Sequence, residues 1–274
     1  MEQLRRIFDF YLQSSIHVAL SVFSLIMVTD ILLHLEPNFY MAGFGFFGTI
    51  VGYNFVKYDA IARSGTPELS MKLKWFIAIS AVAFLGTVFC FFHLQLRTQL
   101  ASGIFLLITA LYTLPFFPNR KNARSWAGLK IYIVALCWVG VTFVLPVLNA
   151  GVPMEIDFLI ISVKRFILIV VLLFVFEIID LAWDDPHLKT VPQQIGVKRT
   201  KQLGILLLLL FLILELFQID ESWPRFFINS GLIAITSLFL IFANEKRSKY
   251  YTTFWTESIP VLWWILLLVF GKCL

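Results

Sequence analysis

Residues 158–184 read FLIISVKRFILIVVLLFVFEIIDLAWD. The first 22 residues of this stretch are almost wholly apolar, and a helix needs about 20 such residues to cross the hydrocarbon core of a bilayer. The apolar run ends on acids, with Asp180 and Asp184 four residues apart. The stretch therefore predicts a membrane-spanning helix with a pair of carboxylates at one end.

The rest of the chain has the same apolar character. Of its 274 residues, 59% are hydrophobic and 14% are charged, whereas soluble domains carry about 25% charged residues. One soluble core cannot cover this much apolar surface, and disorder requires the opposite composition. The three cysteines are scattered, so we expect neither a disulfide framework nor a zinc site. The composition predicts an all-α polytopic integral membrane protein.

Nine segments are apolar enough to span a bilayer: 16–35, 39–56, 75–92, 101–117, 131–148, 158–179, 203–219, 226–243 and 251–270. The first contains Asp30 and no cleavage site follows it, so we expect a retained helix and not a signal peptide. With a cytoplasmic N-terminus and alternating spans, 17 of the 22 Lys and Arg residues are cytoplasmic and three lie on the opposite side. This asymmetry agrees with the positive-inside rule. It places the C-terminus on the opposite side, and it explains the basic pI without nucleic-acid binding.

The two longest cytoplasmic loops, 57–74 and 180–202, follow the second and the sixth predicted spans. Because these spans are four apart, we expect two halves of four helices with the ninth added, in a single domain over 1–274. Membrane proteins with internal repeats often place a site between the halves.

The carboxylates of Asp180 and Asp184 share one face of a continuing helix, where they repel each other. A cation would neutralise them, and Mg²⁺ suits this role because it binds oxygen ligands and bridges carboxylates to phosphates. Basic residues near the same loops would hold a polyphosphate: Lys57, Arg63, Lys121, Arg124 and Lys189. The alternative is a solvated helix end without a ligand. Asn54, at the end of the second span, is either a neutral ligand or an interhelical hydrogen-bonding residue, and by itself it favours the second interpretation.

These clusters resemble those of the UbiA superfamily of intramembrane prenyltransferases. The resemblance covers essentially the whole chain. It rests on the following residues: Asp180-x-x-x-Asp184, Lys189-Thr190-Val191-Pro192 with Gly196, Asn54, and Tyr112-Thr-Leu-Pro115 before the basic segment 120–130.

The resemblance implies nine spans and an isoprenyl diphosphate bound through Mg²⁺ between two polar motifs. The diphosphate leaves, and a hydrophobic acceptor, often aromatic, attacks the allylic cation. By this resemblance Asp180 and Asp184 bind Mg²⁺, Asn54 assists, and Asp185 is a further ligand. The protein would lie in a plasma or inner membrane.

The chain departs from the family at the first motif. Phe55, Tyr58 and Ala62 stand where the family usually has acids, and Asp59 is displaced by one residue. Either Asp59 substitutes, or the protein binds a different lipid, or it has lost catalysis. Three hypotheses follow: a prenyltransferase, a non-catalytic protein of the same fold that binds or carries a lipid, and an unrelated transporter.

Two further features need separate interpretation. The sequence Gly43-x-Gly45-x-x-Gly48 lies inside a predicted span, which argues against nucleotide binding because that motif requires a βαβ unit. Lys164 and Arg165 lie inside the span 158–179, and we expect them to extend toward the outer surface of the membrane, with the lining of a cavity as the alternative.

Overall fold

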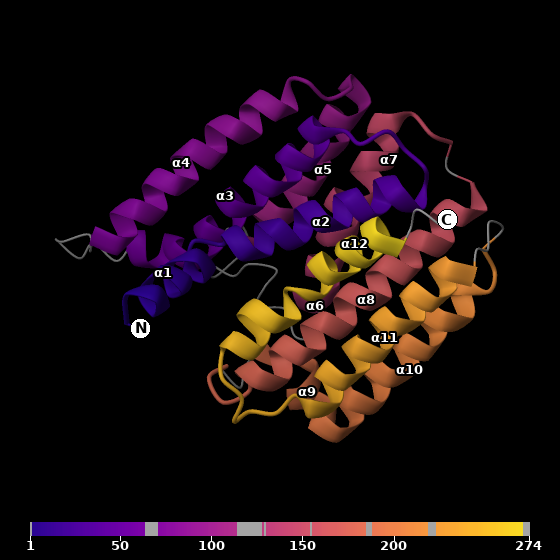
Figure 1. Ribbon diagram of the computed structural model, residues 1–274. Helices are drawn as coiled ribbons and strands as arrows, with labels where there is room; N and C mark the ends of the chain where they lie inside the picture. Colours follow the sequence, from indigo (N-terminus) through magenta and orange to yellow (C-terminus); the bar gives the residue numbers. More distant parts are fainter. Residues whose placement is uncertain are drawn as a thin grey trace.

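The computed structural model describes residues 2–63, 71–113, 128, 130–153, 155–184, 188–218 and 223–270, and the side chains of 59–63 and 112–113 lie outside this description. Within the described residues the chain is helical and contains no strand, which confirms the all-α prediction. Figure 1 shows the helices gathered in one bundle, with the start of α1 and the end of α12 toward opposite ends.

Within the described residues, each of the nine predicted spans overlaps at least one helix, while residues 114–117 and 219 of two of these spans lie outside the description. The elements are α1 (Glu2–Gln13), α2 (Ile16–Leu32), α3 (Phe39–Arg63), α4 (Met71–Phe91), α5 (Leu96–Thr113), α6 (Lys130–Val139), a π-helical turn (Gly140–Val144), α7 (Leu145–Ala150), α8 (Ile156–Asp180), α9 (Val191–Ile195), α10 (Val197–Glu215), α11 (Trp223–Phe242), a second π-helical turn (Tyr251–Thr256) and α12 (Ile259–Phe270).

In the described part of the chain, six stretches are long and apolar enough to cross a membrane: Phe39–Tyr58, Met71–Phe91, Lys130–Ala150, Ile156–Asp180, Trp223–Phe242 and Tyr251–Phe270. The pair α1 and α2, bent by 55°, gives a seventh if it is one span. The apolar part of α5 is shorter, and α10 begins with the cations Lys198, Arg199 and Lys201. The protein is thus an integral membrane protein by its helices, while nine spans and the four-plus-four repeat remain predictions.

The bend between α1 and α2 was not expected from the sequence. Ser15 adopts a left-handed backbone conformation, with φ of 63°, which turns the chain between the two helices. The amphipathic helix α1 packs Phe8 against Phe254, with ring centroids 5.1 Å apart, and leaves Leu4 and Ile7 exposed. These apolar side chains on a surface helix are typical of a segment that lies in the membrane interface.

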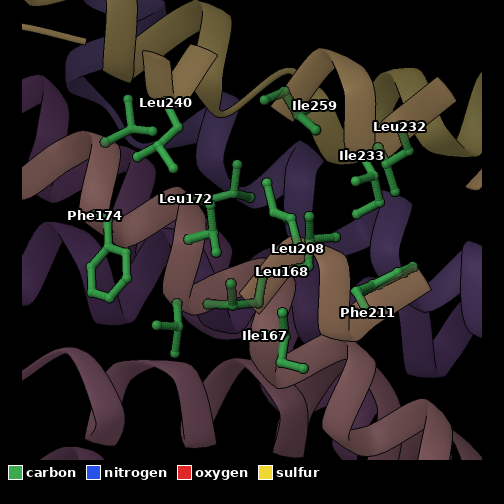
Figure 2. Packing of buried hydrophobic residues seen from close by; sticks show 14 of the residues in the cluster. Ile167, Leu168, Leu172, Phe174, Leu208, Phe211, Leu232, Ile233, Leu240 and Ile259 are labelled. Carbon is green, nitrogen blue, oxygen red and sulfur yellow. The ribbon is translucent and has the colours of Figure 1, made fainter. Parts of the chain in front are cut away.

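The principal core forms around α8. Its 25 residues make a helix about 37 Å long, which exceeds the roughly 30 Å of a bilayer's hydrocarbon core. Leu168 and Val171 are completely buried because apolar residues surround the helix on all sides. Figure 2 shows side chains of α8, α10, α11 and α12 packed against one another, among them Leu172, Leu208 and Leu240.

The last helix closes the bundle against the first half. Helix α12 packs along α2, and α2 also packs against α3 and the first π-helical turn. Residues of both ends of the chain therefore surround the same interior.

The prediction that Lys164 and Arg165 extend to the surface is wrong. Their relative exposures are 3% and 1%. The ammonium of Lys164 contacts the carboxylate of Glu215 and donates to the amide oxygen of Gln218. The guanidinium of Arg165 donates to the carbonyl of Leu25 at 2.9 Å. Partners from other helices keep these charges inside, because an unpaired charge in hydrocarbon is costly.

Glu215 joins this buried network to α11 and α12. Its carboxylate accepts a hydrogen bond of 2.7 Å from Asn229 and lies 3.5 Å from the guanidinium of Arg225. Asn229 in turn accepts a bond of 3.0 Å from the indole of Trp263. One carboxylate therefore balances cations from two helices.

We expect Glu215→Gln to destabilise the protein by about 3–5 kcal/mol, because it leaves the Lys164 ammonium buried without a counter-charge. Thermal unfolding in detergent measures this effect. The double variant K164M/E215Q should recover only part of the loss, since it removes the Lys164 charge but leaves the buried Arg225 guanidinium without the Glu215 carboxylate. Equal unfolding temperatures for wild type and E215Q would contradict a stabilising role of the pair.

Candidate functional site

Three carboxylates gather at the end of α8. Glu177 and Asp180 lie three residues apart on the helix, and the amide of Asp184 donates to the carbonyl of Asp180 at 2.8 Å. This bond has the spacing of an α-helix, so the turn after Asp180 keeps both aspartates on one side of the helix end. The predicted juxtaposition of Asp180 and Asp184 is thus present in the local backbone.

The first of these acids also organises the segment that follows. The carboxylate of Glu177 accepts a hydrogen bond of 3.0 Å from the amide of Val191, at the start of α9. Thr190 caps this short helix reciprocally with Gln193, and Pro192 lies in its first turn, where a missing amide hydrogen costs nothing. The chain therefore returns to α8 directly after its acidic end.

Cations from other segments approach the same place. The charges of Lys130, the first residue of α6, and of Lys249 act on the carboxylate of Asp180. Lys130 acts on Glu177 as well. The ammonium of Lys249 lies 5.5 Å from the ring centroid of Trp183. Three acids and two lysines from three parts of the chain thus meet at one end of the bundle.

The segment before α6 also lies beside this group. Gly128 has a φ of +74°, and a β-carbon there would lie 2.9 Å from the side-chain nitrogen of Gln194. Lys189, one of the predicted phosphate-binding residues, precedes α9 and is exposed, and its backbone carbonyl accepts a hydrogen bond from the side chain of Gln194. Of the lysines Lys130 and Lys189, Lys130 is the one whose charge acts on the acids of α8.

Asn54 is held by serines from two other helices. Its amide oxygen accepts from Ser15 at 2.8 Å, and its amide nitrogen donates to Ser80 at 3.0 Å. The side chain is buried, with a relative exposure of 3%. This geometry agrees with the interpretation of Asn54 as an interhelical hydrogen-bonding residue.

A second charged group surrounds Asn54. Lys57 donates to Ser15 at 3.0 Å, and its charge interacts with that of Glu257, from the turn before α12. Both charged residues remain accessible, Lys57 exposed and Glu257 half-buried. The sequence signalled Glu257 only as an acid inside the predicted span 251–270, and its proximity to Lys57 depends on α2, which packs against both α3 and α12.

His17 connects this group to the last span. Its ring nitrogens lie 2.8 Å from the hydroxyl of Tyr11 and 2.9 Å from the carbonyl of Phe254. A hydrogen bond to Ser258, at 3.1 Å, adds a further contact. His17 is thus a structural link between α2 and the second π-helical turn.

Several predicted site residues lie outside the described part of the structure. These are Asp185, Lys121 and Arg124, and the side chains of Asp59 and Arg63. Among the described residues, no hydrogen bond or ion pair joins Asn54 to Asp180 or Asp184. The predicted four-ligand metal site is therefore untested.

The acidic end of α8 offers carboxylate oxygens, the ligand type that divalent cations such as Mg²⁺ prefer. One carboxylate oxygen of Asp184 is buried and has no hydrogen-bonding partner, and a second carboxylate lies one turn away. In the described residues no three Asp, Glu, His or Cys side chains form a metal cage by themselves. Mg²⁺ does not require one, because it commonly uses one or two carboxylates together with water and phosphate oxygens.

The fold is that of known UbiA homologues. The structure matches "Structure of a UbiA homolog from Archaeoglobus fulgidus bound to GPP and Mg2+" with a TM-score of 0.64 and 17% identity over 96% of this chain and 99% of that one. The form of that homologue bound to DMAPP and Mg²⁺ matches at the same TM-score with 15% identity, again over 96% and 99%. A digeranylgeranylglyceryl phosphate synthase matches at 0.58 with 16% identity over the full length of both chains. No protein-family profile and no curated protein sequence matches the chain.

We expect Asn54→Ala to lower the stability of the protein by about 1–3 kcal/mol, because the buried hydroxyl of Ser15 and the half-buried hydroxyl of Ser80 lose their amide partner. Thermal unfolding measures the change, and Ser80→Ala, which removes only one of the two bonds, should cost less. If N54A unfolded like wild type but no longer bound an isoprenyl diphosphate, Asn54 would be a ligand and not a structural residue.

Proposed function

We propose that this chain is an intramembrane prenyltransferase of the UbiA superfamily. In this proposal it transfers an isoprenyl group from an isoprenyl diphosphate to a hydrophobic, often aromatic, acceptor with Mg²⁺. The proposal is carried by the Asp180–Asp184 pair, which stands at the end of the most buried helix of a fold shared with proteins described as bound to GPP, DMAPP and Mg²⁺.

Asp180 and Asp184 would hold Mg²⁺, with Asp185 and Asp59 as further acids. The ion would supply positive charge that stabilises the diphosphate as it leaves. Lys189 and Lys57 would bind phosphate oxygens directly, with Arg63, Lys121 and Arg124 completing the predicted set. We add Lys130, whose charge already acts on Asp180 and Glu177.

The bilayer would deliver both substrates. Apolar side chains are exposed along several helices, for example Leu106 on α5 and Leu209 on α10. Such surfaces are stable in lipid and suit an isoprenyl tail or a greasy acceptor that arrives sideways. We further propose nine spans in a plasma or inner membrane, with the N-terminus cytoplasmic and the C-terminus opposite.

A non-catalytic lipid-binding protein of the same fold is the second candidate. Two observations at the first motif favour it. The side-chain amide of Asn54 is already hydrogen-bonded to Ser15 and Ser80. Tyr58 stands where the family usually has an acid, and its hydroxyl donates to the carbonyl of Gln13 at 2.9 Å. Such a protein would bind the diphosphate at the acidic end of α8 without breaking it.

We expect purified wild-type protein, incubated with Mg²⁺, a labelled isoprenyl diphosphate and a panel of lipid-soluble acceptors, to release diphosphate. Asp184→Asn should lower the rate by about 100-fold or more, since charge stabilisation by a metal ion is worth several kcal/mol. The matched control is Asp157→Asn, the same change near the other end of α8. Equal rates in wild type and D184N would reject the site.

Equilibrium binding separates the two candidates. We expect the wild type to bind Mn²⁺, as measured by electron paramagnetic resonance. Its affinity for Mn²⁺ should rise when an isoprenyl diphosphate is present. In D184N the isoprenyl diphosphate should not raise the Mn²⁺ affinity. If the protein bound the isoprenyl diphosphate but released no diphosphate with any acceptor, the result would support the lipid-binding protein. Absence of both binding and release would overturn both candidates.

A further inference from the structure

A groove lies between α10 and α11, and none of the acids at the end of α8 lines it. Its volume is about 390 Å³. Three polar and two apolar residues line it: Lys198, Lys201, Gln202, Ile205 and Ile241. Neither the prenyl-transfer reaction nor its substrates require this groove.

The polar lining comes from the first turns of α10. Lys201 donates to the carbonyl of Ile241 at 2.8 Å, near the end of α11, where backbone carbonyls lack helical partners. An ammonium has three donors, so this bond fixes the side chain and leaves further donors for a ligand. Lys198 and Gln202 are exposed beside it.

The apolar lining continues onto a surface that faces lipid. Ile205 follows Lys201 by one helical turn, so it lies deeper along α10 on the same face. Beyond it, Leu209 on α10 and Leu238 on α11 are exposed at 53% and 52%. The groove is therefore cationic at one end and open to hydrocarbon at the other.

The surroundings of the polar end are strongly basic. Neighbouring positions in the chain carry four more cations against one acid: Arg199, Lys246, Arg247, Lys249 and Glu245. Two of these cations already contact other groups of the protein. Arg247 donates to the carbonyl of Phe242, and Lys249 faces the ring of Trp183. Lys198 and Lys201 are the cations that the groove itself presents.

We propose that this groove binds an anionic phospholipid, with its phosphate on Lys198 and Lys201 and an acyl chain along Ile205 and Ile241. Basic pockets between membrane helices at the bilayer boundary suit such headgroups. A soluble phosphate would match the lysines but would leave the isoleucine wall without a partner. The groove thus selects an amphiphile whose charged and apolar parts are arranged in the same order as its lining.

The test uses the intact protein in detergent with phosphatidylglycerol and phosphatidylcholine of identical acyl chains, and native mass spectrometry measures the bound lipid. We expect the wild type to prefer phosphatidylglycerol. In the variant K198Q/K201Q the ratio of the affinities for phosphatidylglycerol and phosphatidylcholine should fall about 30-fold. This fall is equivalent to about 2 kcal/mol for the two cations. The matched control K72Q/K74Q, which removes two exposed cations at the start of α4, should keep the preference.

Ile205→Trp tests the apolar end without changing any charge. We expect this variant to bind less phosphatidylglycerol, with an unfolding temperature like that of wild type. Equal binding of both lipids by the wild type, or an equal loss in K72Q/K74Q, would overturn the proposal. Complete competition by glycerol phosphate would also overturn it, because the site would then recognise the phosphate alone.

Discussion

The absence of water from the bilayer core imposes the main constraint on this protein. A polar group at that depth has only the rest of the chain to bind, so each one must find an internal partner. Lys164 and Arg165 show the consequence, because each is buried and each is bonded by residues of other helices. The packing of the bundle therefore follows from where its polar groups are as much as from its apolar faces.

This constraint separates the polar groups into two kinds. Around Glu215 and Asn54 the side chains are buried and their hydrogen bonds are made within the chain. At the end of α8, by contrast, three acids lie close together, and one oxygen of Asp184 is buried without a partner. A structural role accounts for the first kind. The second kind has carboxylate oxygens that a cation from outside the chain could bind, and our proposal therefore places the reaction there.

The sequence was sufficient for features that depend on neighbouring residues. The apolar run 158–179 predicted α8 to within two residues at its start and one at its end, and the spacing of Asp180 and Asp184 predicted their common side. Partners distant in sequence were not predictable. Glu215 lies 51 residues after Lys164, and the sequence gives no sign that packing joins them. Helix α1 was missed because its apolar residues are too few and too interrupted by charges to be recognised as a span.

The bend at Ser15 couples the membrane surface to the interior. One hydroxyl, placed at the corner between α1 and α2, bonds to both Asn54 and Lys57. Helix α1 leaves Leu4 and Ile7 exposed, as do helices that lie in the membrane interface. The corner that joins this surface helix to α2 is therefore also the place where the Asn54 amide and the Lys57 ammonium share one hydroxyl.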